Sequence, residues 1–143
     1  MAQWKQVVVG VDGSENSKRA LQWASEEASV HGAALLVVSS WAVPLAATPV
    51  VAPNVPWGKT QLAEDAEAVL QTMLSEVLGD SPSVPVDGRV VEGNPAKVLI
   101  DLSDRADLLV VGSRGVGGFT GLLLGSVSQH LAAHAQCTVV VVR

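Results

Sequence analysis

The sequence is short of cysteine and of basic residues. Cys137 is the only cysteine among 143 residues, which excludes an intramolecular disulfide and favours a reducing, cytoplasmic setting. The 9 Lys and Arg residues are outnumbered by 14 Asp and Glu residues, so the formal net charge is −5. This balance argues against a nucleic-acid partner, because the phosphates of nucleic acids are bound by basic faces. It does not exclude a nucleotide, since local backbone N–H groups can hold one phosphate chain.

Long hydrophobic runs are also absent. The richest run, 138–142, has the length of a strand, whereas a membrane-spanning helix needs roughly 20 apolar residues. Residues 1–6 lack the basic-then-apolar order of a signal peptide. With 143 residues, 48% of them hydrophobic, the chain can bury one sizeable core. We therefore expect a single domain over 1–143 in a soluble cytoplasmic protein with no membrane partner.

Apolar runs rich in β-branched residues alternate with helical patterns along the chain. The runs predict strands at 7–11, 35–41, 84–91, 107–112 and 137–142, and their continuity is typical of strands covered on both faces. Helical spacing predicts helices over 14–31 and 59–78, from Asn94, and from Ser126. This alternation predicts a doubly wound α/β domain with a five-stranded parallel sheet and four helices.

Turn and cap residues divide these segments. Gly32 is a plausible helix stop, and Asn94 followed by Pro95 has the pattern of a helix N-cap and first position. The segment 42–57 contains Pro44, Pro49, Pro53 and Pro56, so we expect neither a helix nor a central strand there. At about 16 residues it has the length of a lid or binding loop.

A glycine-rich stretch from Gly112 to Ser126 carries the sharpest chemical signal. Six glycines fall within its 15 residues, between an apolar run and a helical pattern. Glycine lets backbone pass close to a ligand, and a helix N-terminus adds free N–H groups and a positive dipole end. Ser126 could cap that helix or give its hydroxyl to a phosphate. The stretch predicts a phosphate-binding loop, although it contains no Walker A sequence.

The spacing resembles a known family. Gly112, two residues, Gly115, nine residues, then Gly125-Ser126 is similar to the G-2x-G-9x-G-[S/T] pattern of ATP-binding universal stress proteins. The resemblance covers the whole chain through the segments 9–14, 92–95, 107–112 and the closing valine-rich run. The chain looks like the single-domain form common in actinobacteria. This resemblance implies the adenine-nucleotide alpha-hydrolase-like fold, with strand order 3-2-1-4-5.

The resemblance also implies a site for ATP. Asp12 and the two residues before it would lie near the adenosine, and Ser40 would offer backbone groups to the adenine edge. The glycine-rich stretch from Gly112 to Ser126 would hold the ribose and the phosphates. Mg²⁺ or Mn²⁺ would accompany the phosphates, held mainly by phosphate oxygens and water rather than by protein ligands. The implied nucleotide-binding positions are Gly10, Val11, Asp12, Ser40, Val111, Gly112, Ser113, Arg114, Gly115, Val116, Gly117, Gly125, Ser126, Val127 and Ser128. Family members commonly pair their last strands, which implies a homodimer through Cys137 to Val142.

Several polar residues allow more than one interpretation. Asp12 could be a catalytic base, but a turn carboxylate is the more ordinary role. Arg114 could clamp a phosphate or remain a solvated charge. His130 and His134 share a helix face, yet no further ligand completes a metal site. Cys137 is read as a core residue opening a buried strand rather than as a nucleophile.

These features favour a module that holds a nucleotide over an enzyme that turns it over. Efficient phosphoryl transfer needs a positioned lysine or arginine, a metal carboxylate and a group that orients the nucleophile, and the loop offers only Arg114. We therefore expect an ATP-binding stress-response module with at most weak hydrolysis and no catalytic residue assigned. The alternatives are a relative that prefers AMP or cyclic AMP, a slow nucleotide hydrolase or adenylyl-transferring enzyme, and a signalling module without a nucleotide. The intact glycine spacing speaks against the last.

Overall fold

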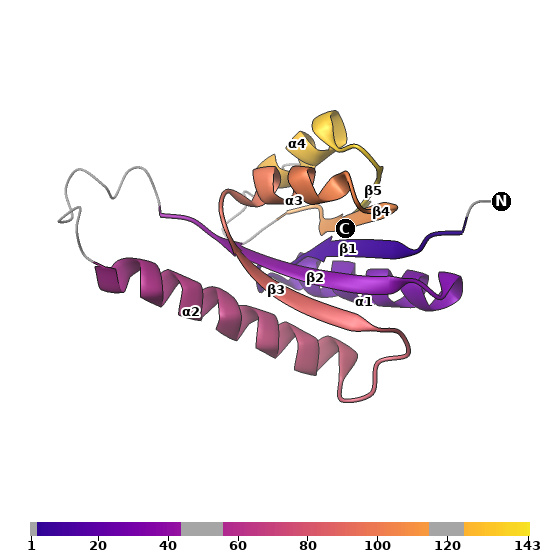
Figure 1. Ribbon diagram of the computed structural model, residues 1–143, viewed down its shortest axis with the longest axis horizontal. Helices are drawn as coiled ribbons and strands as arrows, with labels where there is room; N and C mark the ends of the chain where they lie inside the picture. The colour runs from indigo at the N-terminus through magenta and orange to yellow at the C-terminus, as the bar shows by residue number, and fades with distance from the viewer. Residues whose placement is uncertain (1–2, 44–55, 115–124) are drawn as a thin grey trace.

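The described strands form one parallel sheet. The computed structural model describes residues 3–43, 56–114 and 125–143. The sheet order is β3-β2-β1-β4-β5 (Figure 1), which confirms the expected doubly wound fold and strand order. The order reverses between β1 and β4, the position at which such sheets bind ligands. The strands are β1 (Gln6–Gly10), β2 (Ala34–Trp41), β3 (Val86–Glu92), β4 (Leu108–Gly112) and β5 (Thr138–Val142).

The helices cover the two faces of the sheet in pairs. In Figure 1, α1 and α2 lie on one side, and α3 and α4 lie together on the other. This arrangement requires strands that are apolar on both faces, as the continuous runs indicated. The helices are α1 (Glu15–His31), α2 (Pro56–Met73) with its continuation η2 (Leu74–Leu78), α3 (Pro95–Ser103) and α4 (Ser126–His134).

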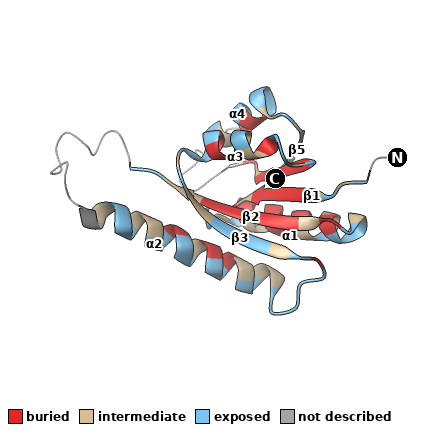
Figure 2. Cartoon of the chain, in the orientation of Figure 1, coloured by how far each residue is buried: buried red, intermediate tan, exposed pale blue. Residues whose placement is uncertain are grey.

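Alternate residues of β1 build two separate cores. Val7 and Val9 pack with the helices α1 and α2, whereas Val8 packs with α3 and α4, because successive side chains point to opposite faces of a sheet. Leu21 on α1 and Leu131 on α4 are both fully buried. Figure 2 shows the burial concentrated in the central strands.

The caps predicted at Gly32 and Asn94 are present, and Ser14 caps the start of α1. The Ser14 side chain accepts a hydrogen bond from the Ser17 N–H at the start of α1, and Gly32 ends that helix with φ 63°. The Asn94 side chain accepts from the N–H groups of Ala96 and Lys97. Local hydrogen-bonding chemistry therefore fixes where these helices begin and end.

The prediction for α2 was wrong at its start and incomplete at its end. The helix begins at Pro56, so the predicted loop 42–57 was too long, because proline at the first helical position lacks only an N–H that would have no partner there. Residues 44–55 of that loop lie outside the described residues. The last turn, Leu74–Leu78, is a π-helix, closed by a hydrogen bond of 3.2 Å from the Gly79 N–H to the Leu74 carbonyl.

The last strand lies at an edge of the sheet, as the expected strand order implied, but the expectation that it is buried was wrong. Among the described strands β5 pairs only with β4, and Val139 to Val142 are half-buried. Cys137 precedes the strand and is itself half-buried beside the second core. Burial, and then the charge of Asp107, raise the pKa of the Cys137 thiol. A raised pKa lowers the thiolate fraction, so this cysteine has the character of a packing residue.

Asp107 joins the starts of two central strands. Its Oδ2 accepts hydrogen bonds from the N–H groups of Lys5, at 2.8 Å, and Gln6, at 3.0 Å. Its own N–H donates to the Gln6 carbonyl at 2.9 Å. The two backbone hydrogen bonds lower the pKa of the Asp107 carboxyl below its ordinary value of 3.8. The ionised form is therefore the one that stabilises the fold.

We expect Asp107→Asn to reduce stability at neutral pH and to have little effect in acid. Because the pKa of Asp107 is lower in the folded chain, its stabilisation is present above pH 3.8 and is lost as the pH falls below that value. The loss at pH 7 should stay below about 1 kcal/mol, since the carboxylate is exposed and screened by water. Urea unfolding from pH 7 to pH 3 measures the difference. The control Asp104→Asn removes an exposed carboxylate nearby; equal pH profiles for the two variants would contradict this role.

Candidate functional site

The ends of β1 and β4 lie side by side at the reversal of strand order. Val9 of β1 pairs with Val110 of β4. The backbone continues the sheet beyond both ends, because the Val11 N–H donates to the Val38 carbonyl at 2.9 Å and the Ser113 N–H donates to the Val142 carbonyl at 2.7 Å. These bonds hold the chain immediately before Asp12 and Arg114 in fixed positions. The two predicted strand ends therefore meet at one edge.

Asp12 acts as a turn carboxylate. Its Oδ1 accepts hydrogen bonds from the Ser14 N–H at 3.0 Å and the Ser14 hydroxyl at 2.5 Å. The Asp12 N–H donates to the Ser17 hydroxyl at 3.3 Å. Asp12 is exposed at the carboxyl edge, and the turn orients it. The structure thus supports the turn interpretation, while the carboxylate stays accessible from solvent.

The N-terminus of α4 is tied to the end of β4. The Gly125 N–H donates to the Ser113 carbonyl at 2.5 Å, and the buried Ser128 hydroxyl donates to the same carbonyl at 3.1 Å. Gly125 is the N-cap residue and no side chain caps the helix among the described residues. The expectation that Ser126 could cap the helix was wrong, because Ser126 lies one position further on and is exposed. Within the described part of the chain, no side chain therefore satisfies the first N–H groups of α4, at the positive end of the helix dipole.

Asn16 is a site residue that the sequence analysis missed. It is 8% exposed, and its Nδ2 donates to the Arg114 carbonyl at 3.3 Å. Its Oδ1 accepts from the Arg19 guanidinium, and the Arg19 Nε donates to the Arg143 carbonyl at 3.1 Å. The first turns of α1 therefore hold both the chain after β4 and the last residue. The only signal in the sequence was an amide side chain within the first turn of a helix that follows a strand.

Two of the predicted site glycines lie close to neighbouring residues, and packing requires glycine at one of them. A Cβ on Gly112 would lie 2.8 Å from the carbonyl carbon of Asn16, and a Cβ on Gly10 would lie 2.7 Å from the Leu99 Cδ1. The Asn16 atom belongs to the backbone of α1 and cannot rotate away, whereas the Leu99 methyl can move. Glycine at 112 therefore allows α1 to approach β4, whether or not a ligand is bound.

The structure brings most of the predicted residues to one edge. Ser40 is half-buried near the end of β2, where it pairs with Val91, and β2 is the neighbour of β1. Val111 is buried in β4, and Arg114 is half-buried just beyond it. The positions Gly115, Val116 and Gly117 lie outside the described residues. The described members of the site at this edge are Gly10, Val11, Asp12, Ser40, Val111, Gly112, Ser113, Arg114, Gly125, Ser126, Val127 and Ser128.

The two helix histidines do not form a metal site with other described residues. His130 and His134 are exposed on α4 with ring centroids 6.4 Å apart, and His130 Nδ1 lies 2.9 Å from the Ser126 carbonyl. Over 3–43, 56–114 and 125–143, no group of three or more His, Cys, Asp or Glu residues could hold a metal ion. Over the same residues, no helix is long and apolar enough to cross a membrane.

Fold and site together define a parallel α/β protein with a candidate binding edge between β1, β4 and α4. The chain belongs to the universal stress protein family, whose model matches residues 3–143. It is 39% identical over 137 residues to a universal stress protein of Mycolicibacterium smegmatis, covering 96% of this chain and 45% of that protein. It is 38% identical to universal stress protein Rv2623 of Mycobacterium tuberculosis, covering 96% and 44%. The chain thus spans less than half the length of these relatives.

Solved structures of the same family have the same fold. Universal stress protein UspA of Lactobacillus plantarum superimposes with a TM-score of 0.85 at 23% identity, over the full length of both chains. A universal stress protein solved in complex with cAMP superimposes with a TM-score of 0.71 at 30% identity, over 99% of each chain.

Proposed function

We propose that this chain is a stress-response module that binds an adenine nucleotide, with ATP as its main ligand, at the carboxyl edge of the sheet. The observation that carries the proposal is the N-terminus of α4, which no side chain of the described residues caps and which is bonded through Gly125 to Ser113 at the end of β4. N–H groups and a dipole fixed in this way suit a phosphate group. The exposed Asp12 carboxylate, oriented by its turn, is a suitable acceptor for sugar hydroxyls.

Two further observations support an adenine nucleotide. The spacing from Gly112 to Ser126 is intact in the sequence, and a family member of 30% identity was solved with cAMP. That relative also favours the second candidate, in which this chain prefers cyclic AMP or AMP. ATP adds outer phosphates that the N–H groups of α4 could bind, and this is why we place ATP first.

The few metal-ligating groups of the protein at this edge suit an Mg²⁺ or Mn²⁺ ion that is held mainly by the phosphates. Asp12 is the one carboxylate among the described predicted site residues, and it already accepts two hydrogen bonds from Ser14. A metal ion there would neutralise phosphate charge. The same scarcity of groups supports a binding module with at most slow hydrolysis, because phosphoryl transfer needs a dedicated metal carboxylate and a nucleophile-orienting group.

The homodimer belongs to the proposal as well. The half-buried Val139 to Val142 lie on the edge strand β5. An apolar edge strand with free backbone groups favours pairing with another strand. In a cytoplasmic dimer, β5 of a second copy would cover the apolar side chains of this strand and pair with its backbone groups.

Calorimetric titration with ATP, AMP and cyclic AMP, each with and without Mg²⁺, tests the proposal. We expect ATP with Mg²⁺ to bind at least about tenfold more tightly than AMP, because the outer phosphates add charge-assisted hydrogen bonds. Asp12→Ala should weaken all three nucleotides. The matched control Asp104→Ala removes an exposed carboxylate at the C-cap of α3 and should leave affinity unchanged. Absence of binding by all three nucleotides would refute the proposal, and tighter binding of cyclic AMP would favour the second candidate.

A further inference from the structure

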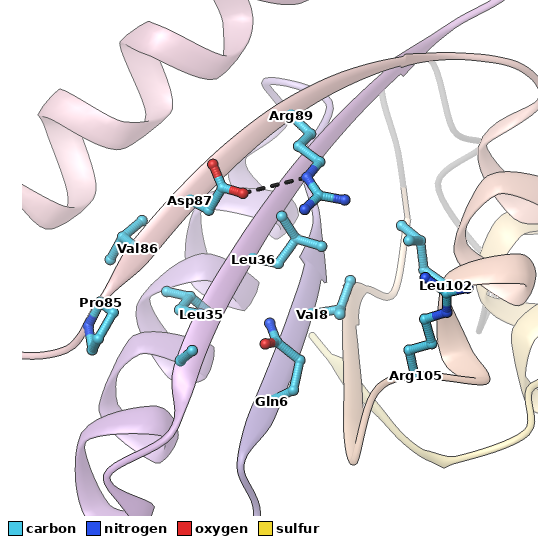
Figure 3. Close-up of a pocket in the computed structure, with 11 residues that line it drawn as sticks. Gln6, Val8, Leu35, Leu36, Pro85, Val86, Asp87, Arg89, Leu102 and Arg105 are labelled. Carbon is cyan, nitrogen blue, oxygen red and sulfur yellow. Dashed lines mark hydrogen bonds and ion pairs between the residues drawn. The ribbon is translucent and has the colours of Figure 1, made fainter.

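A groove of about 340 Å³ opens on the α3 side of the sheet (Figure 3). Its lining includes Gln6, Ala34 and Val86, which are the first residues of β1, β2 and β3. The groove therefore lies at the amino ends of the strands. The candidate nucleotide site lies at their carboxyl ends, so the two are separate.

The groove exists because the helices leave part of this face uncovered. α3 packs on β1, β2 and β4 and α4 packs on β5, whereas β3 extends beyond both helices (Figure 1). The floor is apolar: Val8 is 2% exposed and Leu36 is 7% exposed. Leu102 of α3 forms part of the wall on the helix side of the groove. A volume of this size is at the lower end of the range for small-molecule sites.

Two guanidinium groups stand on opposite walls. Arg89 projects from β3 and Arg105 follows α3, with Val8 and Leu36 between them (Figure 3). The Arg89 Nε donates to the Asp87 carboxylate at 3.3 Å, whereas no acid of the described chain lies within ion-pair distance of Arg105. The lining thus carries two cations and one anion. A local charge of +1, in a chain whose net charge is −5, favours an anionic occupant.

We propose that this groove binds a small organic acid with one carboxylate and an apolar body. The guanidinium of Arg105 supplies hydrogen-bond donors in the planar arrangement that matches a carboxylate, and Arg89 adds a second positive charge. Val8, Leu36 and Leu102 would contact the apolar body. Asp87 disfavours ligands with several negative charges, which distinguishes this site from one for nucleotides.

The probe is octanoate, with 1-octanol as its uncharged counterpart, added to the full chain with ¹³C-labelled methyl groups. We expect octanoate to shift the methyl signals of Val8, Leu36 and Leu102 saturably, and to leave those of Val7 and Leu21 on the opposite face unchanged. Octanol should bind at least about tenfold more weakly, because it lacks the charge-assisted hydrogen bonds. The double variant Arg89→Gln/Arg105→Gln should weaken octanoate by at least about tenfold, and the control Lys97→Gln, an exposed cation outside the groove, should not.

Three results would overturn the proposal. One is the absence of saturable shifts at these methyl groups up to about 10 mM octanoate, a concentration that excludes all but very weak binding. The second is equal affinity for octanoate and octanol, and the third is equal octanoate affinity in wild type and the double variant. Both arginines are exposed, so the double variant should fold. The outcome does not depend on whether the other edge binds a nucleotide.

Discussion

Replacing Gly112 with alanine is expected to destabilise the fold by about 2–3 kcal/mol, the upper part of the range for overpacking. The added Cβ would lie 2.8 Å from the Asn16 carbonyl carbon and 2.9 Å from the Asn16 Cβ. These atoms are fixed to the first turn of α1, so either the helix or the end of β4 must move. That movement would also displace Arg114, whose carbonyl accepts a hydrogen bond from Asn16. Urea unfolding and nucleotide titration measure the two effects.

Gly58→Ala is the matched control for this substitution. Gly58 lies within α2, and a Cβ there would meet no atom of the described residues within 4 Å. Because alanine has the better helix propensity, we expect this variant to gain up to about 1 kcal/mol of stability. The same chemical change should therefore have opposite signs at the two positions. A Gly112→Ala protein that unfolds at the wild-type urea concentration would contradict the close approach of α1 to β4.

The fold could be predicted because its signals are local. Val7, Val8 and Val9 form a continuous apolar run since both faces of β1 are covered by helices. Asn94 and Pro95 show the start of α3 because a cap acts on backbone groups two or three positions away. With five such strands joined by right-handed crossovers, few topologies remain.

The anchoring of the candidate site could not be predicted in the same way. Asn16 and Arg114 are 98 positions apart in the sequence, and nothing in either segment indicates the contact. Gly112 was assigned to a ligand, whereas the structure also gives it a packing role. Glycine serves both needs through the same absence of a side chain, so the sequence does not distinguish them.

Two features of the surface depend on how elements are placed. Leu74 to Leu78 form a π-helix, although the spacing of their apolar residues predicts an ordinary α-helix. The groove between Arg89 and Arg105 exists only because α3 stops short of β3. Neither helical periodicity nor strand alternation in the sequence indicates how far α3 extends across the sheet.

Leu131→Ala is expected to have the largest effect on stability, about 2–5 kcal/mol. Leu131 is fully buried where α4 packs against the second core, among Leu99, Leu109 and Val111. Alanine suits a helix, so the loss would come from packing and from the cavity that remains. The control Val30→Ala removes methyl groups from a helical residue that is 78% exposed, and its effect should stay within about 0.5 kcal/mol. A loss below about 1 kcal/mol for Leu131→Ala would contradict the packing of α4 described here.

The same variant tests how the site depends on α4. The helix is attached to β4 by the Ser128 hydroxyl near its N-terminus and by Leu131 about one turn further along. Loss of the second attachment frees the helix to move about the first, which shifts the N–H groups of Ser126 and Val127. We therefore expect ATP affinity to fall about tenfold in a temperature range where the variant remains folded, because helix N–H groups bind a phosphate only when they are aimed at it. Unchanged affinity in a destabilised variant would mean that α4 contributes little to the site, and the nucleotide would then have to be held by the ends of β1 and β4.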